Sequence, residues 1–244
     1  MPSVLANLWA CNRWDADADL QTASDRAALG VNWQAEVDAL EGDEYNSSPQ
    51  GLAYDAAAWY RDLTEEWPDV PSLIGPEEFI GPGNSDAYRH WNDHWRKLTE
   101  PGDKPDTIQC FDYARYQLLV AGHDTTDYNP DSTTYQVYTT SAGVDMNETA
   151  EGVRYLKRTL VRGVPVLVGI LLATYDAPPE LQNKDKTTNH YVVIVGLGTD
   201  AEGPFFLFLD RLLGSTPQAF YFRPSLKLEH DGEKRLVTQI RETR

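Results

Sequence analysis

The sequence predicts an α+β fold in which a helix packs on an antiparallel β-meander, with an added helical region before it. The first observation behind this expectation is the uneven distribution of charge. Residues 1–100 hold 6 basic and 19 acidic residues, a net charge of −13. Residues 101–244 hold 15 basic and 19 acidic residues, a net charge of −4. The apolar pattern also changes near residue 100, from helical spacing to short β-branched and aromatic runs. We therefore expect an acidic helical region over residues 1–100 and a second domain over residues 101–244.

The first hundred residues contain four segments in which apolar or aromatic residues lie three and four positions apart, the spacing of one helix face. These segments are residues 20–29, 32–40, 52–67 and 85–98. Gly, Pro and Asn separate them, as is typical of loops. This region is therefore expected to be helical, with Asn84 or Ser85 capping its last helix.

The second region begins with a helix expected from about Pro105 to Val120, because Thr107 suits a helix start and Gly122 a helix end. Another helix is expected over residues 147–162. Apolar runs then predict strands, followed by a hairpin around residues 231–232; the runs are 164–172, 191–197, 205–209 and 219–222. Short polar turns between these strands predict an antiparallel meander, and hence an α+β fold.

The composition excludes two classes of protein. The chain has 244 residues, with 21 Lys and Arg against 38 Asp and Glu, a net charge of −17. An acidic chain repels phosphates, so no nucleic-acid partner is expected. No run approaches the roughly 18 apolar residues of a spanning helix, so no membrane insertion is expected. Residues 1–7 lack a basic segment before an apolar one, which predicts cytoplasmic synthesis without a general secretory signal and leaves export by a specialised secretion system open.

Cys110 is the first candidate for chemistry. It falls in the first turn of the helix expected to end at Val120. Unpaired backbone N–H groups and the positive end of the helix dipole lie there, and both favour the nucleophilic thiolate. The alternative is that Cys110 is a small buried hydrophobic residue. Cys11, the other cysteine, lies in an acidic segment and is not expected to be reactive.

His190 and Asp210 are the next candidates. His190 begins an apolar strand, where an imidazole can face a helix start and accept a proton from a thiol; the alternative is a structural edge histidine. Asp210 ends the following strand, and the end of one antiparallel strand lies beside the start of its partner. Asp210 is therefore expected beside His190, where a carboxylate can orient the ring. Asp200, in the intervening hairpin, is its rival.

Two segments resemble the papain-like cysteine hydrolase superfamily in its bacterial form, which includes CHAP and NlpC-type amidases and transglutaminase-like proteins. Residues 109–114, Gln-Cys-Phe-Asp-Tyr-Ala, are similar to the Gln-Cys-x-x-aromatic-Ala signature of CHAP domains. Residues 162–169 and 189–193 resemble the Gly-x-Pro-Val and His-aromatic-Val-Val segments of papain-like peptidases. The resemblance covers about residues 105–222.

This resemblance implies a papain-like fold, with Cys110 as nucleophile, His190 as general base and acid, and Asp210 as orienting carboxylate. It implies acyl transfer from an amide through a thioester, without cofactor. Gln109 and Asn189 are the expected oxyanion or substrate-binding residues, together with the Cys110 backbone N–H. The sequence departs from the family where an oxyanion Gln is expected, because Asp-Lys-Pro stands at residues 103–105.

The function implied is a cysteine amidase or endopeptidase, with bacterial cell-wall (peptidoglycan) stem peptides as the leading substrate. Such an enzyme would suit an antibacterial effector that has a cognate immunity or inhibitor protein. Two alternatives stay open at this point. One is a transglutaminase-like deamidase, acyltransferase or peptidase acting on proteins, and the other is a non-catalytic binding module on a papain-like scaffold.

Two further motifs predict less. His90 and His94 lie four apart on an expected helix and could share a metal, but no catalytic Glu follows His90, so no metal site is expected. The pattern Gly196-x-Gly198 lacks a third glycine and a following helix. A dinucleotide site is therefore not expected either.

Overall fold

The computed structural model describes residues 49–81, 84–98, 109–125, 128–173 and 183–244. The helices predicted at residues 20–29 and 32–40 lie outside this set, as does Cys11. The boundary predicted between residues 100 and 101 also lies outside it and stays a prediction. The chain divides into two compact units, Met1–Glu65 with Arg223–Leu226 and Glu66–Phe222 with Lys227–Arg244.

The described part of the first unit contains the helix α5 (Pro49–Thr64). Proline suits the first position of a helix, because the N–H that it lacks has no partner within the helix there. In the last turn, the Thr64 hydroxyl donates to the Tyr60 carbonyl at 2.7 Å. The sequence placed this helix at residues 52–67, so its position agrees to within three residues at each end.

The second unit contains three helices in its described residues, α6 (Ser85–Leu98), α7 (Gln109–Val120) and α8 (Met146–Val161). The Asn84 side chain accepts the Ala87 N–H at 3.2 Å, which caps α6 as expected. Asp145 caps α8 by accepting the Glu148 N–H at 3.0 Å. Within the described residues, no helix combines the length and the apolar character needed to cross a membrane.

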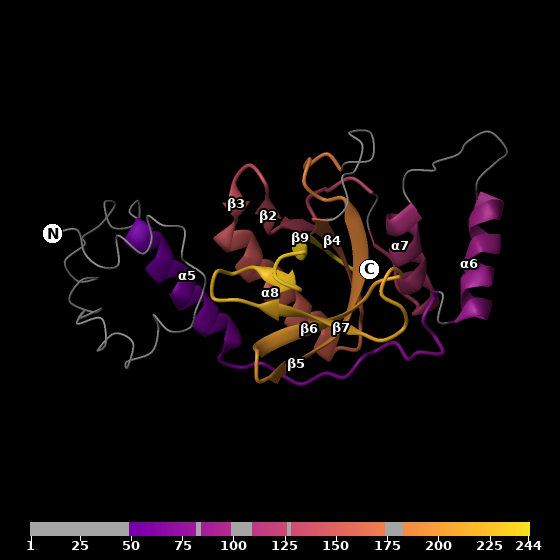
Figure 1. The fold of residues 1–244 in the computed structure, drawn as a ribbon, viewed down its shortest axis with the longest axis horizontal. Coiled ribbons are helices and arrows are strands. Elements are labelled where there is room, and N and C mark those ends of the chain that lie inside the picture. Colours follow the sequence, from indigo (N-terminus) through magenta and orange to yellow (C-terminus); the bar gives the residue numbers. More distant parts are fainter. Residues whose placement is uncertain (1–48, 82–83, 99–108, 126–127, 174–182) are drawn as a thin grey trace. The chain divides into compact units, whose positions relative to one another are not determined.

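Six antiparallel strands of the second unit form a closed ring (Figure 1). They are β4 (Val166–Leu172), β5 (His190–Asp200), β6 (Gly203–Leu209), β7 (Gln218–Phe222), β8 (Leu228–His230) and β9 (Arg235–Arg241). The pairing order is β9-β4-β5-β6-β7-β8, and β8 pairs back with β9 through Glu229–Leu236 and His230–Arg235. These strands therefore make a closed six-stranded antiparallel barrel.

The expected papain-like α+β fold, a nucleophile helix packed on an antiparallel β-meander, is therefore wrong. The apolar runs located β4 to β7, and the hairpin around residues 231–232 joins β8 to β9. Alternation along a strand indicates which face is buried, but it does not specify which distant strand is the partner. The pairing of β9 with β4, more than sixty residues earlier in the chain, has no local sequence signal, and this pairing closes the barrel.

Three short strands lie between α7 and α8, where no strand was predicted from the sequence. β1 (Thr134–Gln136) extends the sheet beside β9, while β2 (Tyr138–Thr139) and β3 (Gly143–Val144) pair with each other. Such strands of two or three residues are too short to give a recognisable alternation of apolar and polar residues. The sequence therefore could not distinguish them from a loop.

Helices α7 and α8 pack against opposite faces of the central strands. Leu167 of β4 belongs to the apolar cluster that contains the α7 residues Phe111, Ala114 and Leu118. The next residue, Val168, points to the other face and pairs directly with Ile240 of β9, against which Gly152 of α8 lies. Neighbouring residues of β4 thus face α7 on one side of the strand and the Ile240–Gly152 contact on the other.

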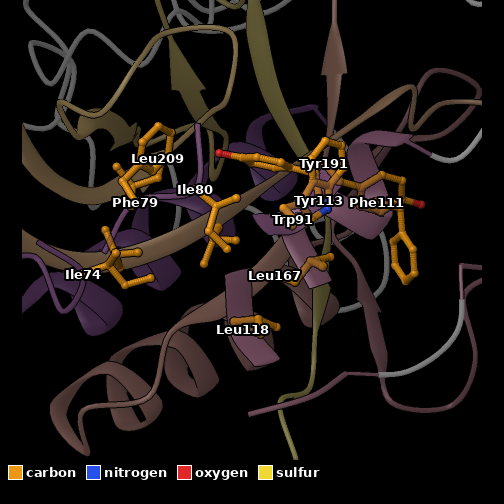
Figure 2. Close-up of a cluster of buried hydrophobic side chains, with 13 residues drawn as sticks. Ile74, Phe79, Ile80, Trp91, Phe111, Tyr113, Leu118, Leu167, Tyr191 and Leu209 are labelled. Carbon is orange, nitrogen blue, oxygen red and sulfur yellow. The ribbon is translucent and has the colours of Figure 1, made fainter. Parts of the chain in front are cut away.

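The apolar cluster under α7 holds this helix in place (Figure 2). It combines side chains of α7 with those of β4, β5 and β6, and with residues from the segment 74–91. Trp91 of α6 meets Tyr113 of α7 edge to face, with ring centroids 5.4 Å apart. The burial of so many aromatic side chains at one helix fixes where its first turn, and thus Cys110, lies on the sheet.

Candidate functional site

Cys110 is the second residue of α7, so it lies in the helix's first turn. It is a free cysteine of intermediate exposure that packs against the edge of the apolar cluster under α7. The first backbone N–H groups of a helix have no partner within it, and they carry the positive end of the helix dipole. Cys110 therefore lies at the electropositive end of α7.

His190 is the first residue of β5, and it is buried. Its ring Nε2 lies 2.9 Å from Oδ1 of Asp210. The Cys110 side chain lies near enough to the ring to help raise its pKa, and Nδ1 is the ring nitrogen that Asp210 leaves free. His190 thus stands between the sulfur and the carboxylate.

Asp210 directly follows β6, whose last residue, Leu209, pairs with Val193 of β5. This register brings Asp210 to the start of β5, beside His190. Oδ1 also accepts the Leu212 N–H at 2.9 Å, which fixes the carboxylate within its own turn. Its second oxygen, Oδ2, lies 3.5 Å from Nε of Arg235, the first residue of β9.

The electrostatics of this group favour a charged histidine. Burial lowers the pKa of His190, but the hydrogen bonds with Asp210 and Cys110 and the nearby negative charge outweigh it and raise the pKa from 6.5 to about 9. For Asp210, burial raises the pKa, yet the His190 hydrogen bond and charge bring it below its usual range. An imidazolium paired with a carboxylate is therefore the expected state at neutral pH.

Gln109 and Asn189, the two other residues expected at the site, lie at the start of α7 and directly before β5. Gln109 begins α7, but its side chain lies outside what the structure describes. The Asn189 side chain accepts the Leu172 N–H at 2.7 Å and donates to the Leu172 carbonyl at 3.1 Å. This pair of bonds ties the start of β5 to the end of β4, so Asn189 supports the position of His190. An oxyanion role for either residue stays a prediction.

Asp200, the rival for the third position, lies at the far end of β5 from His190. Ten residues of strand separate the two, which corresponds to about 33 Å. The Asp200 carboxylate accepts the Tyr221 hydroxyl at 2.9 Å in the β5–β6 hairpin region. Asp200 therefore lies too far from His190 to orient its ring.

Sequence reasoning missed Arg235 and Tyr113. Arg235 reaches Asp210 only because β9 pairs with both β4 and β8, and the local sequence carries no signal for the pairing with β4. Tyr113 lies one helical turn after Cys110, a spacing that places both residues on one face of α7 and could have identified it. Its buried hydroxyl is close enough to Asp210 to feel the negative charge of the carboxylate.

The residue types gathered here are those that nucleophilic catalysis uses. A sulfur at a helix start could serve as nucleophile, the nearby histidine as proton carrier, and the carboxylate bonded to the histidine as orienting group. Among the described residues, no group of three His, Cys, Asp or Glu side chains could hold a metal ion. His94, one of the two histidines considered as metal ligands, has a side chain outside the described set.

No protein-family model, curated protein or solved structure matches this chain.

Proposed function

We propose that the protein is a cysteine-dependent hydrolase that cleaves an amide bond through a thioester. The observation that carries this proposal is the pair of His190 and Asp210, with 2.9 Å between the ring Nε2 and Oδ1, beside a cysteine near enough to influence the ring. The position of Cys110 in the first turn of α7 supports it further, because a helix N-terminus and an imidazolium both favour the thiolate.

The first half of the proposed reaction forms the thioester. The Cys110 thiolate attacks the carbonyl carbon of the amide, and the oxygen becomes an oxyanion, to which the Cys110 backbone N–H would donate a hydrogen bond. The C–N bond then breaks, the amine leaves with the proton of the His190 imidazolium, and the carbonyl re-forms. This step leaves a neutral imidazole beside an acyl-enzyme.

The second half returns the enzyme to its starting state. His190 takes a proton from water, and the resulting hydroxide attacks the thioester carbon. The C–S bond breaks, the acid product leaves, and the Cys110 thiolate again lies beside the imidazolium. Throughout, Asp210 keeps the ring oriented through Nε2 and stabilises the positive charge on it.

The substrate class is a proposal taken from the resemblance to papain-like cysteine hydrolases. Bacterial cell-wall stem peptides are the leading candidate, in an effector whose activity a cognate inhibitor protein would restrain. A transglutaminase-like deamidase or acyltransferase would use the same thioester but act on proteins. Product analysis distinguishes them, since a peptidase releases cell-wall or peptide fragments, whereas a deamidase releases ammonia and a transferase makes crosslinks.

The first test is the rate at which iodoacetamide alkylates Cys110, measured by mass spectrometry between pH 5 and pH 9. We expect rapid alkylation of the folded protein at and below neutral pH, at a rate at least about tenfold above that of His190→Ala, because the imidazolium favours the thiolate. His230→Ala is the matched control, since His230 lies in β8 and its Nδ1 contacts the Ala219 carbonyl.

Either result is informative. Fast alkylation that depends on His190 but not on His230 supports the proposed nucleophile and justifies a screen of cell-wall amides. A thiol that reacts only after denaturation contradicts an enzymatic role for Cys110, and it favours the alternative of a non-catalytic binding module.

A further inference from the structure

The carboxylate of Asp210 has one oxygen whose environment the proposed reaction does not explain. Oδ1 accepts two hydrogen bonds, from His190 and from the Leu212 N–H, each at 2.9 Å. Oδ2 accepts no hydrogen bond from the described residues, although the side chain is 0% exposed. A buried carboxylate oxygen without a donor has lost its hydration without a replacement, so a nearby positive charge is needed to stabilise it.

Arg235 supplies such a charge. Its Nε lies 3.5 Å from Oδ2, and its side chain is only 14% exposed. Within the described residues, this Nε also has no hydrogen-bond partner. Opposite charges attract more strongly where little water separates them, so the Arg235 guanidinium stabilises the charge on Oδ2.

Other groups also face Asp210 from the elements packed around it. His190 approaches from β5 and Tyr113 from α7, while Arg211 follows Asp210 in the chain. Burial, and then the charge of Asp210, raise the pKa of Tyr113, so its hydroxyl stays neutral. Arg235 is the arginine that forms an ion pair with the carboxylate, and its charge is among the causes that lower the pKa of Asp210.

We propose that Arg235 is a positioning residue of the site, which holds the Asp210 carboxylate charged and turned toward His190 through the contact between Nε and Oδ2. Arg235 acts through Asp210 and needs no contact with substrate. The inference rests on the proposed function, because the orientation of Asp210 matters for chemistry only where His190 acts on Cys110.

The test follows the ionisation of Asp210 itself. Carboxyl carbons of aspartate are labelled with ¹³C, the Asp210 signal is assigned by its loss in Asp210→Asn, and the signal is titrated by NMR. Arg235→Gln should raise the titration midpoint by about one pH unit or more, the usual size of an arginine's effect on a neighbouring carboxyl. Arg235→Lys, which keeps the charge, should restore most of the shift. Arg115→Gln is the matched control, because Arg115 pairs with Asp124 at 2.7 Å instead.

A midpoint in Arg235→Gln that stays within about 0.2 pH units of wild type would overturn the proposal. If Arg235→Gln does not fold, the wild-type protein still provides a test, since the ¹⁵N shift of Arg235 Nε should change with the same midpoint as the Asp210 carbon. An Nε signal that ignores the titration of Asp210 would also overturn the proposal.

Cys110 alkylation separates this inference from the proposed function. If both hold, the acid side of the His190-dependent alkylation profile should move to higher pH in Arg235→Gln, in step with Asp210. An unreactive wild-type thiol refutes the proposed function and, with it, a positioning role in catalysis, even where Arg235→Gln shifts Asp210. A reactive wild-type thiol with an unshifted Arg235→Gln profile refutes the role of Arg235 alone.

Discussion

At the scale of single residues, burial and the neighbouring groups shift the pKa of His190 in opposite directions. Burial disfavours its charged form, whereas Asp210 and Cys110 favour it, and the balance raises its pKa to about 9. A pKa that is higher in the folded chain than the unfolded value of about 6.5 means that folding takes up a proton over the range between them. Protonation of His190 therefore stabilises the folded protein.

This linkage predicts how stability depends on pH. The contribution of His190 is fully present below about pH 6.5 and is lost as the pH rises through 9, and a shift from 6.5 to about 9 corresponds to a free energy of unfolding on the order of 3 kcal/mol. In Asp210→Asn this loss should be absent, since the raised pKa depends on the carboxylate. Urea unfolding of both proteins between pH 6 and pH 10 measures it. A wild-type free energy of unfolding that falls no more steeply than that of the variant over this range would contradict the pKa assigned to His190.

At the scale of elements, β5 contains a glycine at the point where another segment pairs closely with it. Residues 70–73 hydrogen-bond to β5, with the Val70 N–H donating to the Leu197 carbonyl at 2.8 Å and the Leu73 N–H to the Val195 carbonyl at 2.8 Å. A Cβ atom at Gly196 would lie 2.6 Å from the Val70 carbonyl oxygen and 3.0 Å from that of Pro71. Gly196 therefore allows two backbones to meet closely, which is a structural explanation for part of the Gly196-x-Gly198 pattern.

Gly196→Ala should destabilise the protein by about 2 kcal/mol, because backbone atoms in a paired segment cannot move aside as a side chain can. The matched control is Gly75→Ala, where the added methyl would meet only the end of the flexible Glu77 side chain. Chemical denaturation gives the free energy of unfolding of both variants. Equal losses at the two positions would be inconsistent with a close backbone approach at Gly196.

Among the elements, the positions of helices and of hairpin strands could be predicted from the sequence, whereas the pairing of distant strands could not. Helix starts and ends carry local signals, such as Asp145 before α8, and the helices were accordingly located to within a few residues. His190 and Asp210 could be placed together because β5 and β6 form a hairpin, in which register follows from the turn. Arg235 could not be placed, because its approach to Asp210 depends on a pairing between strands far apart in the chain.

At the scale of the whole second unit, the barrel is filled by aromatic side chains from successive strands. Phe208 of β6 stacks on Phe220 of β7 with ring centroids 3.9 Å apart, and it meets His230 of β8 edge to face at 5.3 Å. Phe208 and Phe220 are both fully buried. One side chain thus joins three consecutive strands, β6, β7 and β8.

Phe208→Ala should therefore lower the free energy of unfolding by about 3 to 5 kcal/mol, the usual cost of deleting a buried aromatic ring. The loss should be seen equally by far-ultraviolet circular dichroism and by tryptophan fluorescence, because the barrel and the packing around Trp91 belong to one compact unit. Leu212→Ala is the control, since Leu212 is 54% exposed and should change stability by less than about 0.5 kcal/mol. Transitions that separate in Phe208→Ala would indicate that the barrel and the α7 cluster unfold independently.

The position of β9 in the ring has a consequence during translation. Chains are made from the N-terminus, so Cys110, His190 and Asp210 all emerge before Arg235 and the rest of β9. Until then β4 and β8 each lack one of their two neighbouring strands, and the second oxygen of Asp210 lacks the arginine that pairs with it. The ring, and with it the contact between Arg235 and Asp210, can therefore form only after β9 has been synthesised.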